Sequence, residues 1–215
     1  MPSLKLLDVH TTIGCNLSCK GCNHFSNYFA PSSKLDTDAL LRDIEVILPR
    51  LDLGRVNVIG GEPLLNPRCE EILNTCISST KSLVYLYTNG LLLHKNEDWI
   101  RKALENPRVF LRISIHLKEV EDIIKKFNHP KVLVTVHHTG QDRWFNSIKK
   151  RDNKVYPYNH NSITRSYNAC SCPNPQLYNG KLWKCPNTAY LRELLSVTEQ
   201  EDADEWQEYI VDGVP

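Results

Sequence analysis

Five short runs of apolar and β-branched residues punctuate the first two thirds of the chain, and helical patterns separate them. Each run is bounded by Gly, Asn or Pro, as strands usually are, and the runs cover residues 4–12, 55–60, 83–89, 108–117 and 131–138. Between the runs, apolar residues recur at helical spacing, as Leu40, Ile44 and Ile47 do after a capping Asp or Thr. Strands that alternate with helices predict a parallel sheet with right-handed crossovers.

Two parallel architectures fit this alternation, an open Rossmann-like sheet and a closed or partial (β/α) barrel. The glycine fingerprint of dinucleotide-binding folds is absent after the first strand, where a cysteine-rich loop stands instead. In barrels of this kind the chemistry lies on loops at the carboxyl ends of the strands. We therefore expect an α/β fold, a partial (β/α) barrel of about five to six parallel strands.

The last third of the chain has a different organisation. The alternation stops after about residue 140, and the segment QLYNGKLWKCP contains the hairpin turn Asn179-Gly180. We therefore expect the barrel core to occupy residues 1–145 and a small cysteine-containing extension to occupy residues 146–215.

Composition narrows the class of protein further. The chain has 215 residues, 41% of them hydrophobic, and a net charge of +1, which gives no electrostatic footprint of a nucleic acid or membrane partner. Its start, MPSLKLLDVHTT, lacks the long apolar run of a signal peptide or membrane span. A cytoplasmic location follows, where thiols stay reduced. The eight cysteines are then metal ligands, reactive thiols or core residues rather than disulfides.

The loop after the first strand, GCNLSCKGCNHF, contains Cys15, Cys19 and Cys22. We call residues 14–25 the cysteine loop. A tetrahedral zinc site requires four ligands, whereas three thiolates on a 4Fe–4S cluster leave one iron open to bind another molecule. From spacing alone both remain possible, with His24 as a candidate fourth ligand for zinc.

The second strand ends in Gly60, Gly61, Glu62 and Pro63, which we call the GGEP loop. Together, the CxxxCxxC spacing and this loop resemble the radical S-adenosylmethionine (radical SAM) superfamily over residues 5–140. The resemblance implies that the open iron chelates S-adenosylmethionine, which one electron cleaves to methionine and a 5′-deoxyadenosyl radical. It implies that the GGEP loop orients the methionine end, with Glu62 accepting from its ammonium group. It also implies oxygen sensitivity and an electron donor of the flavodoxin or ferredoxin type.

Further positions are candidates for contact with the cofactor or the substrate. The resemblance places cofactor contacts at Asn89, after the third strand, and at Ser114 and His116, which alternate on one face of the fourth strand. His137 and His138 close the fifth strand and are tentative substrate contacts.

The chain departs from the family pattern just before its third cysteine. Many members carry an aromatic residue there, and this chain has Gly21. We expect an adenine contact to be missing, without effect on the cluster ligands.

A second cysteine group, Cys170, Cys172 and Cys185, lies around the predicted hairpin. Its spacing resembles the start of the SPASM or twitch extension, which holds an auxiliary cluster in some radical SAM enzymes. No cysteine follows Cys185 to supply a fourth ligand. The alternatives are a cluster with an open iron, a cluster with a non-cysteine ligand, a small structural zinc site, or unligated thiols. Cys69 and Cys76, by contrast, have the helical spacing of core thiols.

The favoured function is a radical SAM enzyme that oxidises, epimerises or cross-links a small molecule or peptide. One alternative is a non-catalytic iron–sulfur or zinc protein with an electron-transfer or structural role. Another is a radical SAM enzyme like carboxydeazaguanine synthase or the activases, which have no auxiliary cluster.

Overall fold

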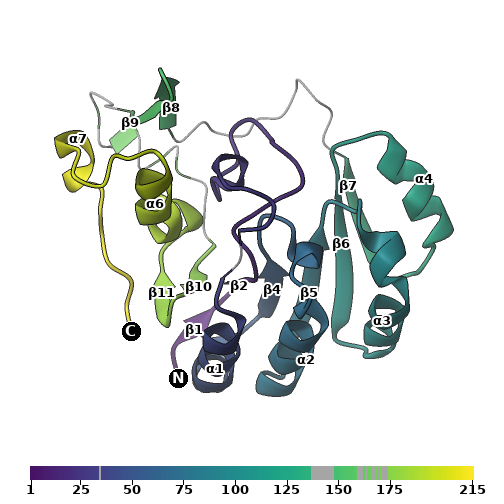
Figure 1. Cartoon of the computed structure of the whole chain (residues 1–215). Helices are drawn as coiled ribbons and strands as arrows, with labels where there is room; N and C mark the ends of the chain where they lie inside the picture. The colour runs from purple at the N-terminus through teal and green to yellow at the C-terminus, as the bar shows by residue number, and fades with distance from the viewer. Residues whose placement is uncertain are drawn as a thin grey trace.

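One seven-stranded sheet forms the centre of the molecule (Figure 1). The computed structural model describes residues 1–33, 35–136, 148–158, 162, 164–165, 168, 170 and 174–215. In spatial order the strands are β11 (Lys181–Trp183), β10 (Gln176–Tyr178), β2 (Leu7–His10), β4 (Arg55–Ile59), β5 (Leu83–Thr88), β6 (Val109–Ile115) and β7 (Val132–Val136). All neighbouring pairs are parallel except β10 with β11. The predicted α/β partial barrel is confirmed.

Four helices connect the consecutive parallel strands, as the periodicity predicts. They are α1 (Thr37–Ile47), α2 (Cys69–Ser79), α3 (Leu93–Glu105) and α4 (Glu119–Lys126). The Asp36 side chain caps α1 by accepting from the Ala39 N–H at 3.0 Å. Figure 1 shows α1, α2 and α3 side by side along one face of the sheet. No helix in the described part of the chain is both long and apolar enough to cross a membrane.

Shorter elements complete the fold. They are β1 (Ser3–Leu4) paired with β3 (Asp52–Leu53), β8 (Ile148–Arg151) paired with β9 (Lys154–Pro157), the 3₁₀ turns η1 (Ser26–Tyr28), η2 (Leu48–Arg50) and η3 (Pro63–Leu65), and the helices α6 (Pro186–Val197) and α7 (Asp204–Gln207).

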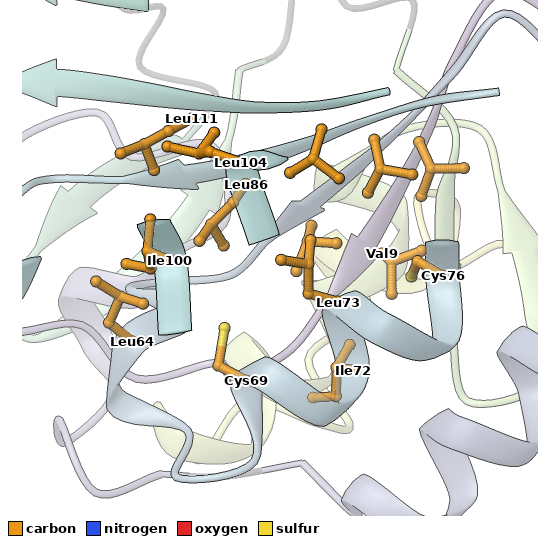
Figure 2. Packing of buried hydrophobic residues seen from close by; sticks show 14 of the residues in the cluster. Val9, Leu64, Cys69, Ile72, Leu73, Cys76, Leu86, Ile100, Leu104 and Leu111 are labelled. Carbon is orange, nitrogen blue, oxygen red and sulfur yellow. The ribbon is translucent and has the colours of Figure 1, made fainter. Parts of the chain in front are cut away.

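Alternation along the strands gives the sheet an apolar face and a polar face. Val9, Val58, Leu86 and Leu111 are buried in the core that packs against the helices. Figure 2 shows this core around α2, where Cys69 and Cys76 lie among aliphatic side chains. Their predicted core role is confirmed, and burial raises the pKa of both thiols. The opposite face carries polar residues and lines the inside of the partial barrel.

The C-terminal hairpin joins the barrel sheet. Asn179 and Gly180 form its turn with φ of 49° and 68°, as predicted for a two-residue hairpin turn. β10 also pairs in parallel with β2, with Gln176 opposite Asp8. The hairpin, which the sequence assigns to the extension, therefore covers the edge that β2 would otherwise expose.

A second hydrophobic core joins the C-terminal residues to the cysteine loop. Tyr190 and Leu194 of α6 pack in one cluster with Trp183, Val155 and Phe25. Phe25 is the last residue of the cysteine loop and is 2% exposed. Residues far apart in the sequence thus hold one end of this loop in place.

Candidate functional site

A cavity of about 480 Å³ opens at the carboxyl ends of the parallel strands. We call it the barrel cavity, and it is lined by Asp8, Cys15, Leu17, Cys19, Cys22, Asn23, His24, Ser26, Arg55, Asn57, Ile59, Gly60, Gly61, Glu62, Pro63, Tyr87, Thr88, Asn89, Arg112, Ser114, His116, Thr135 and Asn174. A second groove, of about 580 Å³, runs along the outside of α2 and holds none of the predicted site residues. The barrel cavity is therefore the candidate site.

The three thiols of the cysteine loop line this cavity together and are partly exposed. The Sγ atom of Cys15 accepts from the Leu17 N–H at 3.4 Å and lies 3.9 Å from Asn89 Nδ2. The Sγ atom of Cys19 lies 3.9 Å from His116 Nδ1. Burial raises the pKa of the Cys15 thiol to about 12, so a thiolate at this position requires a positive charge beside it.

Close backbone contact joins the GGEP loop to the cysteine loop. The Gly61 N–H donates to the Thr12 carbonyl at 2.8 Å, and the Glu62 N–H donates to the Gly14 carbonyl at 3.0 Å. A Cβ atom on Gly61 would lie only 2.1 Å from the Gly14 oxygen. The close approach that Gly60 and Gly61 allow in the structure is therefore to the neighbouring backbone.

Glu62 is fully buried and connects the loops that follow β4 and β5. Its Oε1 atom accepts from the Leu64 N–H at 3.2 Å and the Thr88 hydroxyl at 2.6 Å, and its Oε2 atom accepts from the Asn89 N–H at 2.8 Å. Burial raises the pKa of this carboxyl to about 7. Since a carboxylate oxygen can accept two hydrogen bonds, Oε2 keeps an acceptor position for the ammonium group that the family resemblance implies.

The other predicted cofactor positions also reach the barrel cavity. Asn89 Nδ2 donates to Asn16 Oδ1 at 2.6 Å and so connects the loop after β5 to the cysteine loop. Ser114 and His116 line the cavity, whereas Ile113 and Ile115 belong to the core on the helix side. The expected alternation of this strand is therefore found.

Several buried polar atoms beside the thiols lack a protein partner within the described residues. They include Asn23 Oδ1, His24 Nε2 and Ser26 Oγ, which all belong to cavity-lining residues. Buried polar atoms are nearly always paired, so these indicate space for a bound molecule or ordered water. The residues present thus fit a bound polar group.

The three thiols of the cysteine loop do not converge on the position of a single metal ion. Across the described ranges, no group of three His, Cys, Asp or Glu side chains could hold one metal ion. A 4Fe–4S cluster binds each thiolate to a different iron and does not require such convergence. His24, the candidate zinc ligand, is instead stacked against His10 with ring centroids 5.1 Å apart, and burial lowers its pKa to about 4.

Polar side chains from the strands form the base of the barrel cavity, which we call the polar floor, and they were not predicted from the sequence. They are Asp8, Arg55, Asn57 and Arg112. Asp8 accepts from Asn57 Nδ2 at 2.6 Å and from Gln176 Nε2 at 2.8 Å, while Arg55 and Arg112 project from β4 and β6. The signal was present as single polar residues at alternate positions in the apolar runs, as in RVNVI and LRISI.

Of the remaining predicted residues, Cys170 and Cys185 do not line the barrel cavity. His137, His138 and Cys172 lie outside the described residues. Cys170 is exposed, and Cys185 is partly buried at the start of α6, with its Sγ 3.8 Å from Thr188 Oγ1.

Gly21, where many members of the family carry an aromatic residue, has a φ of 74°. This left-handed backbone conformation favours glycine, so an aromatic side chain would be strained at that position.

The family model of the Radical SAM superfamily matches residues 9–149. The chain therefore belongs to the radical SAM superfamily of enzymes, and membership implies a 4Fe–4S cluster and S-adenosylmethionine. The chain is 32% identical over 104 residues to GTP 3′,8-cyclase of Aquifex aeolicus, and the match covers 46% of this chain and 32% of that protein. It is 30% identical over 118 residues to GTP 3′,8-cyclase of Mycolicibacterium smegmatis, covering 54% of this chain and 31% of that protein. The matched part thus spans about a third of the length of each of these relatives.

The fold also resembles that of BtrN, whose crystal structure holds AdoMet and 2-DOIA. The TM-score is 0.57 with 15% identity, and the likeness covers 98% of this chain and 87% of BtrN. At this identity the likeness concerns the fold alone.

Proposed function

We propose that this chain cleaves S-adenosylmethionine reductively at a 4Fe–4S cluster held by Cys15, Cys19 and Cys22. When bound, the two cofactors supply a 5′-deoxyadenosyl radical that removes hydrogen from a small-molecule or peptide substrate. The observation that carries the proposal is the meeting of these three thiols and the GGEP loop in one cavity.

The residues around the thiols have defined parts in this proposal. Asn89 and His116 place nitrogen atoms 3.9 Å from the Cys15 and Cys19 sulfurs, where N–H donors would tune the potential of the cluster. Glu62 receives the ammonium group of the cofactor, and Gly60, Gly61 and Pro63 shape the loop that presents this carboxylate. Ser114 holds the ribose or carboxylate end.

The substrate is proposed to lie on the polar floor beneath the cofactor. By analogy, the similar proteins support a small polar substrate. The relatives in Aquifex aeolicus and Mycolicibacterium smegmatis are named GTP 3′,8-cyclase, and BtrN was crystallised with 2-DOIA. Oxidation, epimerisation and cross-linking remain the candidate outcomes. A flavodoxin- or ferredoxin-type donor supplies the electron, and a cytoplasmic location suits both the donor and the reduced thiols.

The experiment is to supply anaerobically reconstituted protein with S-adenosylmethionine and dithionite and to measure 5′-deoxyadenosine. We expect release from wild type and none from the Cys15/Cys19/Cys22→Ala variant. Cys69→Ala is the matched control, since it removes a core thiol and should keep both iron and cleavage. An iron-loaded wild type that releases no 5′-deoxyadenosine would contradict the proposal and favour the non-catalytic iron–sulfur alternative.

A further inference from the structure

Two arginines lie on the inner face of the sheet. Arg55 begins β4, Arg112 lies in the middle of β6, and both line the barrel cavity. Neither forms an ion pair within the part of the chain that the structure describes. The Nε atom of Arg55 is buried without an acceptor, and Arg112 donates to the Thr135 hydroxyl at 3.4 Å.

Both guanidinium groups are positioned by aromatic rings on the strand between them. Arg55 lies over Tyr85, with Cζ 5.3 Å from the ring centroid, and Arg112 lies over Tyr87 at 5.6 Å. The two rings are neighbours, with centroids 6.5 Å apart. Stacking on a ring orients a guanidinium group while leaving its N–H edge available to a planar or tetrahedral anion.

The acidic residues of the cavity lining neutralise this charge only in part. They are Asp8 and Glu62. Asp8 interacts electrostatically with Arg55, but both of its oxygens already accept from the amides of Asn57 and Gln176, and burial raises the pKa of its carboxyl. Glu62 accepts from three protein donors on the GGEP side of the cavity. Partly buried charges are costly without a counter-ion, and two guanidinium groups beside one such carboxyl indicate that a ligand supplies a further negative charge.

We propose that Arg55 and Arg112 bind the anionic part of the substrate, a carboxylate or a phosphate, at the floor of the barrel cavity. Arg112 lies two residues before Ser114 on the same face of β6, which places it deeper than the residues assigned to the cofactor. The substrate role rests on the proposed function, whereas the anion site itself can be tested without turnover.

The test is calorimetric titration of the anaerobically reconstituted protein with inorganic phosphate and, separately, with malonate. The variants are Arg55→Gln and Arg112→Gln, and the matched control is Arg50→Gln, at an exposed arginine on η2. We expect binding by wild type and the control, and binding about ten- to a hundredfold weaker in each cavity variant. Preference for phosphate indicates a phosphorylated substrate, and preference for malonate indicates a carboxylated one. Absence of binding to wild type, or equal binding by all four proteins, overturns the proposal.

Two further measurements keep the outcome clear if a variant fails to fold. Phenylglyoxal labelling of wild type, mapped by mass spectrometry, should show that the bound probe protects Arg55 and Arg112 but not Arg50. Equal labelling of all three arginines with and without the bound probe would contradict the proposed anion site. Affinity for S-adenosylmethionine is measured in parallel, because its loss in Arg112→Gln would assign this arginine to the cofactor instead. Wild type that binds the anion but releases no 5′-deoxyadenosine would refute the proposed function and leave the anion site intact.

Discussion

Glu62 accepts the main-chain N–H of Asn89 at 2.8 Å, so one buried carboxylate joins the loops that follow two neighbouring strands. Asn89 then donates to Asn16 in the cysteine loop at 2.6 Å. Three loops, which are separate in the sequence, are therefore held together by two side chains. Cys15 lies beside this arrangement, with its sulfur 3.9 Å from the Asn89 amide nitrogen.

Glu62→Ala should destabilise the folded chain strongly at pH 5. The substitution removes the acceptor of three hydrogen bonds and leaves buried N–H and O–H groups unpaired. We expect a loss of about 3 to 5 kcal/mol in the free energy of unfolding, measured by urea denaturation. The control Glu70→Ala lies at an exposed position of α2 and should change stability by less than about 0.5 kcal/mol. Equal effects of the two substitutions would contradict a tethering role.

The effect of Glu62→Ala should also depend on pH, in a direction that follows from burial. Burial raises the pKa of Glu62 from its ordinary 4.5 to about 7. Between these values the folded state holds a proton that the unfolded state has lost, so the contribution of Glu62 to stability falls as pH rises. The gap between wild type and variant should narrow by about 2 to 3 kcal/mol from pH 4.5 to 7.5. A gap that widens would mean that the three donors keep the carboxylate ionised.

Gly61→Ala should separate the GGEP loop from the cysteine loop. Its new Cβ would meet the Gly14 oxygen at 2.1 Å and the Gly14 carbon at 2.5 Å, and backbone atoms of this kind cannot move aside easily. We expect a loss of about 2 kcal/mol or more and reduced iron content after reconstitution. The control Gly180→Ala strains a left-handed hairpin position, at a φ of 68°, and should keep its iron. Normal iron in Gly61→Ala would show that the cluster tolerates displacement of the loop.

Much of this fold and site could be predicted because the signals are local. The strand–helix alternation predicts the parallel barrel, and the cysteine and GGEP loops follow directly after β2 and β4. The pairing of β10 with β2 could not be predicted, because it joins Gln176 to Asp8 across 168 positions and no local pattern encodes it. The roles of Glu62 and Asn89 as tethers were likewise hidden, since they depend on how neighbouring loops meet in space.

His10→Phe should make the chain more resistant to acid. His10 is fully buried between His24 and Tyr190, with ring centroids at 5.1 Å and 4.3 Å, and neither of its nitrogens has a partner among the described residues. Burial lowers the pKa of His10 well below its ordinary 6.5, so the unfolded state gains a proton first as pH falls. His10 therefore costs wild type stability below pH 6.5, about 1 kcal/mol by pH 5.5.

This acid penalty can be measured by urea unfolding at pH 7.5 and pH 5.5. The difference between His10→Phe and wild type should shift in favour of the variant at the lower pH. The control His94→Gln replaces an exposed histidine of α3 and should show no comparable shift. A shift of the same size in both variants would mean that burial of His10 is not the cause.

The last prediction concerns the second cysteine group. If Cys170, Cys172 and Cys185 hold an auxiliary cluster, wild type should contain iron and labile sulfide for two clusters per chain after anaerobic reconstitution. The Cys15/Cys19/Cys22→Ala variant should then keep one cluster, and Cys170/Cys172/Cys185→Ala should keep the other. A different result would contradict the auxiliary cluster. In that case wild type would contain one cluster, which the first variant would lose entirely and the second would retain. Oxidation of the substrate would then have no auxiliary cluster to accept the second electron. A redox-neutral radical reaction would become the better explanation.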